Sequence, residues 1–409
     1  MKLPLEGIRV LDLSRAAAGP FCTMILGDFG ADVMKVEAAP DGDLLRAFGP
    51  FHEGEGTYFL SINRNKRSVA VSLRTEEGRA LLRDLALRAD VLVENFKPGI
   101  AAEMGLGADA LRRERPELIY ASISGFGSSG PYGEWPGVDQ IAQGMSGLMS
   151  VTGNEVGKPT RVGVPIADLT AGMWSALGIL AALYERRGSG NGDRVETSLL
   201  SALMGLLCVQ GQRYLSLGEV AEPVGNQHPV ICPYGVVGTA DGPLNVCVAT
   251  QEMWTKFCSI IGREDLIAHR DYADNTARRR NRESLMALLD EAFSRDTQRA
   301  WASRLIAAGI PAGPIYRIDQ ALSDAHVVAT GIVEQVKHPR IGELDLVGNP
   351  ARLESLGGKS IWRSPPLLGE HSREALEAWG IAPERVAALV TAKVVRTLNA
   401  AQSGDEHVR

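Results

Sequence analysis

Short apolar runs alternate with longer amphipathic segments up to about residue 125. The runs GIRVLDLS, ADVMKVEA, RSVAVSL, DVLVEN and LIYASIS have the length of strands and are mostly apolar. Between them, AGPFCTMILGDFG, TEEGRALLRDLALRA and the segment near 107–114 have the pattern of helices, and Thr75 is placed to cap the second of these. Mostly apolar strands separated by helices predict a largely parallel α/β sheet that is covered on both faces.

A different pattern begins near residue 225. PYGVVGT and LNVCVA flank an Asp-Gly turn, which predicts a β-hairpin, and helices are expected near 251–262, 282–293 and 297–308. Beyond residue 330, GIVEQVKH and LDLVGNP read as strands, and a helix is expected over 372–379. The last segment, NAAQSGDEHVR, has the composition of a frayed or disordered tail. These patterns predict a smaller α+β unit after the α/β part.

Composition narrows the class of protein. A chain of 409 residues with 45% hydrophobic and 22% charged residues is expected to form two domains with sizeable cores. The net charge of −6 argues against a nucleic-acid partner. Five cysteines without a close CxxC pair indicate reduced thiols, and the longest apolar stretches, 169–183 and 199–209, look too short or too interrupted by glycine to span a bilayer. We therefore expect a cytoplasmic protein without a membrane partner.

One charge stands out in the segment RVGVPIADLTAGMWSALGILAALYERR, residues 161–187. The β-branched run Val162, Val164 and Ile166, broken by Pro165, reads as a strand that ends at Asp168, where a long apolar helix begins. Asp168 has two compatible interpretations. It is a candidate helix N-cap, and it is a candidate carboxylate nucleophile that the helix N-terminus would keep ionised at neutral pH.

Other sequence motifs suggest other kinds of site or a structural role. A dinucleotide site would use Glu37 at the end of the second strand, but the preceding turn SRAAAGP lacks the required glycine spacing. A GxGxxG pattern occurs at Gly125, Gly127 and Gly130, yet PYGEWPG follows it and cannot open a helix, so we interpret it as a Gly-rich loop. Asp139 precedes another expected helix and would be a cap by default. No residues have the spacing of metal ligands, and no GxSxG motif or P-loop is present.

Seven ordered segments, from about residue 4 to about residue 380, resemble the class III CoA-transferases, the formyl-CoA transferase and carnitine CoA-transferase family. They include LPLEGIRVLDLSRAAAGP, NRNKRSV, ADVLVENFKPG, ISGFGSSGPY, VGVPIADLTAG and SPPLLGEH. The resemblance implies a large Rossmann-like CoA-binding domain built from 1–200 and 331–409, a linker helix over 201–224 and a small α+β domain over 225–330. It also implies two interlocked subunits.

The resemblance further implies a covalent mechanism. The catalytic aspartate of the family falls on Asp168, and a second acidic residue falls on Asp139. Attack of Asp168 on an acyl-CoA would give a mixed anhydride and then an aspartyl-CoA thioester, so that CoA moves between acids without ATP. Acyl-CoA is then a substrate, and no tightly bound cofactor is expected. Backbone N–H groups near Asp168 or on the Gly-rich loop are candidate oxyanion donors.

The expected CoA contacts come from two loops and one strand. The family places the loop after the first strand, the Asn-Phe pair and the end of a neighbouring strand against CoA, and we add two basic residues as phosphate partners on charge and position. Two basic positions of formyl-CoA transferase are Ala38 and Glu103 here, so phosphate contacts must differ in detail. The predicted set is Arg15, Ala16, Ala17, Ala18, Val71, Leu73, Asn95 and Phe96, with Arg74 and Lys97 added.

Three questions stay open at this point. The related α-methylacyl-CoA racemases carry a histidine just before the second acid, where this chain has Val138, so two-base proton exchange lacks its partner. A non-catalytic acyl-CoA-binding protein is the other alternative, although ADLTAG is intact. Arg15 and Arg46 could pair with a second carboxylate, which favours a dicarboxylic donor such as succinyl-CoA, or they could serve CoA phosphates and surface ion pairs.

Overall fold

The computed structural model describes residues 3–398 and divides the chain into two compact units. Within these residues, the larger unit contains the chain up to 148, then 162–218 and the part from 330 onward, and the smaller unit contains 149–161 and 219–329. Residues 201–217, expected in a linker helix, lie in the larger unit, and 149–161 join the smaller one. The expected disordered tail, 399–409, lies outside the described residues.

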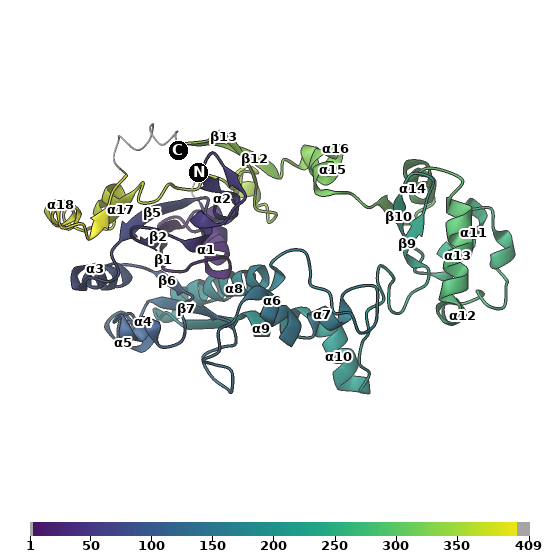
Figure 1. Cartoon of the computed structure of the whole chain (residues 1–409), viewed down its shortest axis with the longest axis horizontal. Coiled ribbons are helices and arrows are strands. Elements are labelled where there is room, and N and C mark those ends of the chain that lie inside the picture. The colour runs from purple at the N-terminus through teal and green to yellow at the C-terminus, as the bar shows by residue number, and fades with distance from the viewer. Residues whose placement is uncertain (1–2, 399–409) are drawn as a thin grey trace. The chain divides into compact units, whose positions relative to one another are not determined.

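A seven-stranded sheet forms the centre of the larger unit, in the order β14-β5-β2-β1-β6-β7-β8 (Figure 1). All neighbouring pairs are parallel except β14 with β5, which confirms the predicted parallel α/β sheet. The order runs outward in opposite directions from β1 and β6, so the topological switch point lies between these two strands. The strands are β1 (Arg9–Asp12), β2 (Asp32–Ala38), β5 (Lys66–Val71), β6 (Val91–Glu94), β7 (Ile119–Ser124), β8 (Arg194–Ser198) and β14 (Val395–Arg396).

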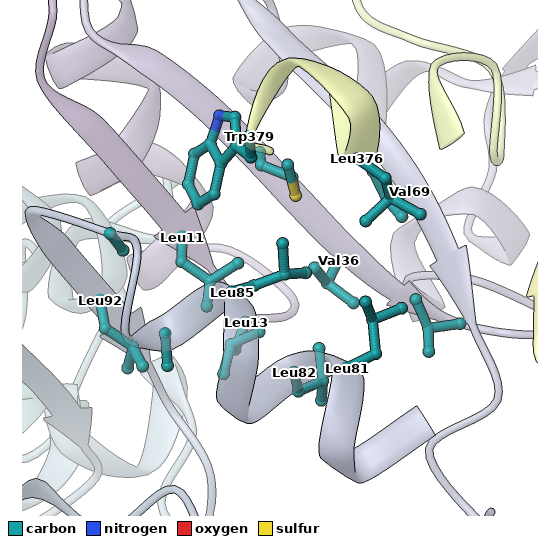
Figure 2. Packing of buried hydrophobic residues seen from close by; sticks show 14 of the residues in the cluster. Leu11, Leu13, Val36, Val69, Leu81, Leu82, Leu85, Leu92, Leu376 and Trp379 are labelled. Carbon is teal, nitrogen blue, oxygen red and sulfur yellow. The ribbon is translucent and has the colours of Figure 1, made fainter. Parts of the chain in front are cut away.

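Successive residues of the central strands face opposite cores. Leu11 of β1 belongs to the cluster that also holds Leu82 and Trp379, drawn in Figure 2, whereas the adjacent Val10 belongs to the cluster under α1 and α8. The side chains of both cores are almost completely buried, as expected for a sheet covered on both faces. The covering helices are α1 (Ala18–Asp28), α3 (Glu76–Ala86), α5 (Ala108–Glu114), α6 (Asp139–Met145), α8 (Ile166–Ser189), α9 (Leu199–Leu206), α17 (Ser372–Ala378) and α18 (Pro383–Thr391). The next helix, α10 (Cys208–Leu217), follows α9 and buries none of its side chains.

The segment before α8 is not the strand that the sequence predicts. Residues 162–165 have irregular backbone, and the helix begins at Ile166 with Pro165 as its N-cap. Asp168 is therefore the third residue of the helix, and the prediction that it is the N-cap is wrong. At 24 residues α8 is also longer than expected, and by length and composition alone it could span a membrane. Its packing against α1, α9, β7 and β8 is that of a core helix.

The smaller unit has a three-stranded antiparallel sheet in the order β11-β10-β9. Its apolar core contains Trp254, Phe257 and Phe293, and the β9–β10 hairpin confirms the predicted Asp-Gly turn. Its regular elements are β9 (Tyr234–Gly238), β10 (Pro243–Cys247), β11 (Ala312–Pro314), α11 (Gln251–Ile260), α12 (Asn275–Arg280), α13 (Arg282–Phe293), α14 (Gln298–Ala307), α15 (Ile318–Ser323) and α16 (Ala325–Thr330). The remaining elements of the chain are α2 (Thr57–Ile62), α4 (Ile100–Glu103), α7 (Leu148–Val151), β3 (Phe51–His52), β4 (Glu55–Gly56), β12 (Val333–His338) and β13 (Gly342–Val347).

Candidate active site

Two loops meet where β1 and β6 end, at the switch point of the sheet. The amide of Asn95 locks them together, because its Oδ1 accepts from the Arg15 N–H at 2.8 Å and its Nδ2 donates to the Arg15 carbonyl at 2.7 Å. The next residue, Ala16, has a left-handed backbone with φ of 60°, and its N–H donates to Asp43 Oδ1 at 3.3 Å. A strained non-glycine residue persists only where its surroundings hold it, and such residues cluster at ligand sites.

A cavity of about 320 Å³ opens beside these loops and reaches both predicted acids. Its lining includes Asp168, Asp139 and five of the predicted CoA contacts, which are Ala16, Ala18, Asn95, Phe96 and Lys97. Most of the other lining residues are apolar or glycine, and they include Ile123, Gly125, Trp135, Gly137, Val138 and Leu199.

The other predicted CoA contacts do not line this cavity. Val71 is fully buried in the core, Leu73 packs against the same core, and Arg74 is exposed at the end of β5. Ala17 is buried in a small cluster. Arg15 is exposed, and its guanidinium has no hydrogen bond or ion pair with any residue of 3–398.

The carboxylate of Asp168 is distinguished by its hydrogen bonding and by its pKa. Among the residues that the structure describes, none donates a hydrogen bond to it. Burial and, second, the negative charge of Asp139 raise its pKa from 3.8 to about 7. Burial therefore opposes the expected effect of the helix N-terminus, which was to keep this group ionised at neutral pH. A carboxylate with a raised pKa is a stronger nucleophile, and near neutral pH a substantial fraction is still ionised.

Asp139 caps α8 rather than its own helix. It is the first residue of α6, after Val138 as the N-cap, and its Oδ1 accepts from the N–H of Ala167 at 2.8 Å. Its Oδ2 accepts from Nε2 of Gln143 at 2.7 Å. Sequence reasoning missed Gln143, for which the only signal was its position four residues after Asp139, one helical turn away.

A buried network of charges supports the loop after β1. Asp12 accepts from the Ser14 N–H at 3.0 Å and from Nζ of Lys66 at 3.1 Å. Lys35 donates to the Ser14 carbonyl and pairs with Asp43, both at 2.9 Å. These four charged side chains are almost completely buried. Asp12, Lys35 and Lys66 lie within mostly apolar strands, which is the only sign of this network in the sequence.

Glu37 and Arg46 bind each other and are not available to a ligand. The guanidinium of Arg46 donates twice to the Glu37 carboxylate, each time at 2.7 Å, and lies 3.7 Å from the ring centre of Phe59. Glu37 also accepts from Ser68 Oγ at 2.6 Å, and these partners lower its pKa to about 2 despite its burial. The ion pair agrees with the rejection of a dinucleotide site at Glu37, and of the two alternatives for Arg46 it supports the ion pair over binding of a substrate carboxylate.

The Gly-rich motif forms a loop, as expected, and no helix begins between this motif and Asp139. Gly125 and Gly137 approach so closely that a Cβ on Gly125 would lie 2.5 Å from the Gly137 Cα. This contact folds the loop back onto itself along one wall of the cavity. Within residues 3–398 no group of three or more His, Cys, Asp or Glu side chains could hold a metal ion.

Comparison with known proteins gives consistent similarities. A family model described as CoA-transferase family III matches residues 5–372. Succinyl-CoA:glutarate CoA-transferase of Mus musculus is 40% identical over 375 residues, covering 91% of this chain and 86% of that protein. Succinyl-CoA:mesaconate CoA-transferase of Haloarcula marismortui is 37% identical over 392 residues, covering 92% and 96%. The crystal structure of a CAIB/BAIF family protein from Brucella suis, 35% identical, superposes with a TM-score of 0.83 and covers 93% of this chain and all of that one.

Proposed function

Because the chain belongs to CoA-transferase family III, it moves CoA from an acyl-CoA to a carboxylic acid, and we propose that it does so through covalent intermediates on Asp168. The observation that carries the proposal is the state of this carboxylate. It receives no hydrogen bond from residues 3–398, has a raised pKa and lines the cavity at the switch point of the sheet. Such a group is suited to nucleophilic attack.

The proposed exchange consists of successive nucleophilic attacks on carbonyl carbons. A carboxylate oxygen of Asp168 attacks the thioester carbonyl carbon, the C–S bond breaks, and CoA leaves as a thiolate from a mixed anhydride. The thiolate attacks the Asp168 carbonyl carbon, which releases the first acid as its carboxylate and leaves an aspartyl-CoA thioester. The acceptor carboxylate then attacks the aspartyl carbonyl carbon, the C–S bond breaks, and a second mixed anhydride and CoA thiolate form. The thiolate attacks the acceptor acyl carbon of this anhydride, which gives the new acyl-CoA and releases Asp168 as a carboxylate. The thioester energy is retained throughout, so no ATP is needed.

We place CoA along the two loops at the switch point. Ligands of open α/β sheets bind at the carboxyl ends of the strands at this point, where Ala16–Ala18 and Asn95–Lys97 lie. Leu73 and Arg74, beyond the end of β5, extend the binding surface toward the nucleotide end of CoA. The fully buried Val71 supports them from below and does not offer its own side chain.

The residue next to Asp139 favours CoA transfer over epimerisation, and the names of the relatives favour a dicarboxylic substrate over a monocarboxylic one. Val138, next to Asp139 in the cavity, has no group that could exchange an α-proton. The relatives are named for succinyl-CoA, glutarate and mesaconate, all of which carry a second carboxylate. We propose that the guanidinium of Arg15, which has no partner within residues 3–398, binds this second carboxylate.

A substrate panel tests this assignment. With succinyl-CoA as donor, we expect dicarboxylic acceptors to react faster than monocarboxylic acids of equal length, and Arg15→Gln to raise KM for dicarboxylic acids about tenfold or more. The exposed Arg113→Gln is the matched control and is expected to change neither value. An Arg15→Gln enzyme that is weakened equally toward all CoA esters would show instead that Arg15 holds the CoA phosphates.

We also propose a homodimer with interlocked subunits in the cytoplasm. An apolar stripe runs along α8, where Trp174, Leu177 and Tyr184 are 50%, 56% and 79% exposed. Large apolar side chains on α9 and α10, such as Val209 and Leu215, are exposed as well. Surfaces of this kind on a soluble enzyme support association with another subunit. All five cysteines are free thiols, which agrees with a reducing compartment.

A further inference from the structure

We propose that Gln143 is a positioning residue of the transferase: its side-chain amide locks Asp139 and the segment before α8 into the single arrangement that presents Asp168 to the thioester. The inference rests on the proposed role of Asp168 as nucleophile. It adds a residue that contacts neither CoA nor the acyl group, and that acts through Asp139 and through the backbone that leads to the nucleophile.

The contacts of Gln143 define a bridge between two elements. The side chain is fully buried, its Nε2 donates to Asp139 Oδ2 at 2.7 Å, and its Oε1 accepts from the N–H of Val162 at 2.9 Å. An ionised carboxylate only accepts and a backbone N–H only donates, so the amide can satisfy both partners in one orientation alone. The bridge therefore has no alternative arrangement of equal energy.

This bridge matters because α8 lacks a cap of its own. Its N-cap is Pro165, whose side chain makes no hydrogen bond, and the N–H of Ala167 is satisfied by Asp139 Oδ1. Gln143 and Asp139 thus hold both ends of the short segment from Val162 to Ala167. Asp168 directly follows Ala167, which is itself fully buried, so the position of the nucleophile depends on this pair of contacts.

The same bridge fixes the charge beside the nucleophile. Asp139 contributes to the raised pKa of Asp168, and the two acids line the cavity together with Lys97. If Asp139 turns away, Asp168 loses both its backbone anchor and the neighbouring charge. A displacement of about 1 Å at a reacting group can cost about 100-fold in rate.

Gln143→Glu tests the inference, because it keeps the size of the side chain and the oxygen that faces Val162 but replaces the donor that faces Asp139. We expect kcat to fall about 10- to 100-fold while KM for acyl-CoA stays within about twofold. At acid pH the new carboxylate and Asp139 can share a proton, so the ratio of variant to wild-type kcat should be highest there. It should fall as the pH rises and the shared proton is lost.

Two further variants distinguish a positioning role of Gln143 from a general loss of folded structure. Gln143→Met removes both hydrogen bonds and should lower kcat without the pH-dependent ratio. Gln335→Glu breaks an exposed hydrogen bond to Asp345 between β12 and β13 and should change nothing. A wild-type kcat for Gln143→Glu at every pH measured would overturn the proposal. So would unfolding of both Gln143 variants, or a loss of kcat that is matched by a loss of acyl-CoA binding.

Trapping of the intermediate separates this inference from the proposed function. If the wild-type enzyme forms no adduct on Asp168, the covalent mechanism fails, whatever Gln143 does. If the wild type forms the adduct and Gln143→Glu forms it at the same rate, Asp168 is the nucleophile and Gln143 does not position it. Slower adduct formation in the variant supports both.

Discussion

Asp168→Asn is expected to reduce CoA transfer at least about a thousandfold while acyl-CoA still binds. The amide has almost the shape of the carboxylate, but it cannot attack the thioester or form an anhydride. The cavity walls and the two CoA loops do not depend on the charge of this residue, because no residue of 3–398 hydrogen-bonds to it. The measurements are initial rates with succinyl-CoA and a dicarboxylic acid, and binding of CoA by calorimetry.

Stability provides the control for this variant. Folding raises the pKa of the Asp168 carboxyl from 3.8 to about 7. At a pH above both values the carboxyl is ionised in both states, and the ionised form is disfavoured in the folded protein, so Asp168 lowers the free energy of unfolding. Neutral Asn removes this cost, and the melting temperature at about pH 8 should equal or exceed that of the wild type. Asp109→Asn, an exposed first-turn acid of α5, should retain full activity. Transfer by Asp168→Asn at a tenth of the wild-type rate or more would contradict the assignment.

Asp12→Ala is expected to lower the free energy of unfolding by about 3 to 5 kcal/mol, which is the usual cost of breaking a buried ion pair by removing one partner. The change removes the carboxylate that accepts from Lys66 Nζ and from the Ser14 N–H, so Lys66 stays in the interior without its ion-pair partner. Asp12→Ala should also weaken CoA binding, because the loop after β1 loses the hydrogen bonds that hold it. Urea unfolding followed by circular dichroism measures the stability change.

A surface acid with two arginine partners serves as the comparison. Asp84 on α3 pairs with Arg385 and lies near Arg88, but all three side chains are partly exposed. Asp84→Ala should therefore cost less than about 1 kcal/mol, as is usual for exposed ion pairs. If Asp12→Ala is no more destabilising than Asp84→Ala, the buried network does not support the loop as described.

Strand and helix patterns were sufficient for most of the fold. The apolar runs that contain Val10, Met34 and Leu92 lie in the central strands, and Thr75 caps α3 by accepting from the N–H of Gly78. The strand β8 was missed, because its sequence RVETS alternates polar and apolar residues at an exposed sheet edge. Arg194 and Glu196 at that edge face solvent, so the run lacks the apolar character of a central strand.

The start of α8 could not be predicted from local sequence. Val162, Val164 and Ile166 have the β-branched pattern of a strand, but Pro165 interrupts the backbone hydrogen bonding. What satisfies the first turn of α8 is Asp139, which is distant in the sequence. A cap supplied by another element leaves no signal next to the helix, so Asp168 was assigned the role that Asp139 performs.

The candidate site was predictable only where a residue's chemistry is visible in its own segment. Asp168 met that condition, whereas the Asn95–Phe96 pair was predicted only from the resemblance to the CoA-transferase family. The partners of Arg46 did not meet it, because pairing with Glu37 is decided by the fold and not by spacing. Gln143 and Lys35 are similarly ordinary in sequence, and only their burial against charged groups reveals a role.

Mass spectrometry of a trapped intermediate tests the central claim most directly. The wild-type enzyme is mixed with succinyl-CoA in the absence of an acceptor acid and quenched with hydroxylamine or borohydride, and its peptides are then mapped. We expect a hydroxamate or a reduced alcohol on Asp168, and no modification of the same peptide in Asp168→Asn. Full CoA-transfer activity with an unmodified Asp168, or with the adduct on another residue, would contradict the covalent mechanism proposed for this enzyme.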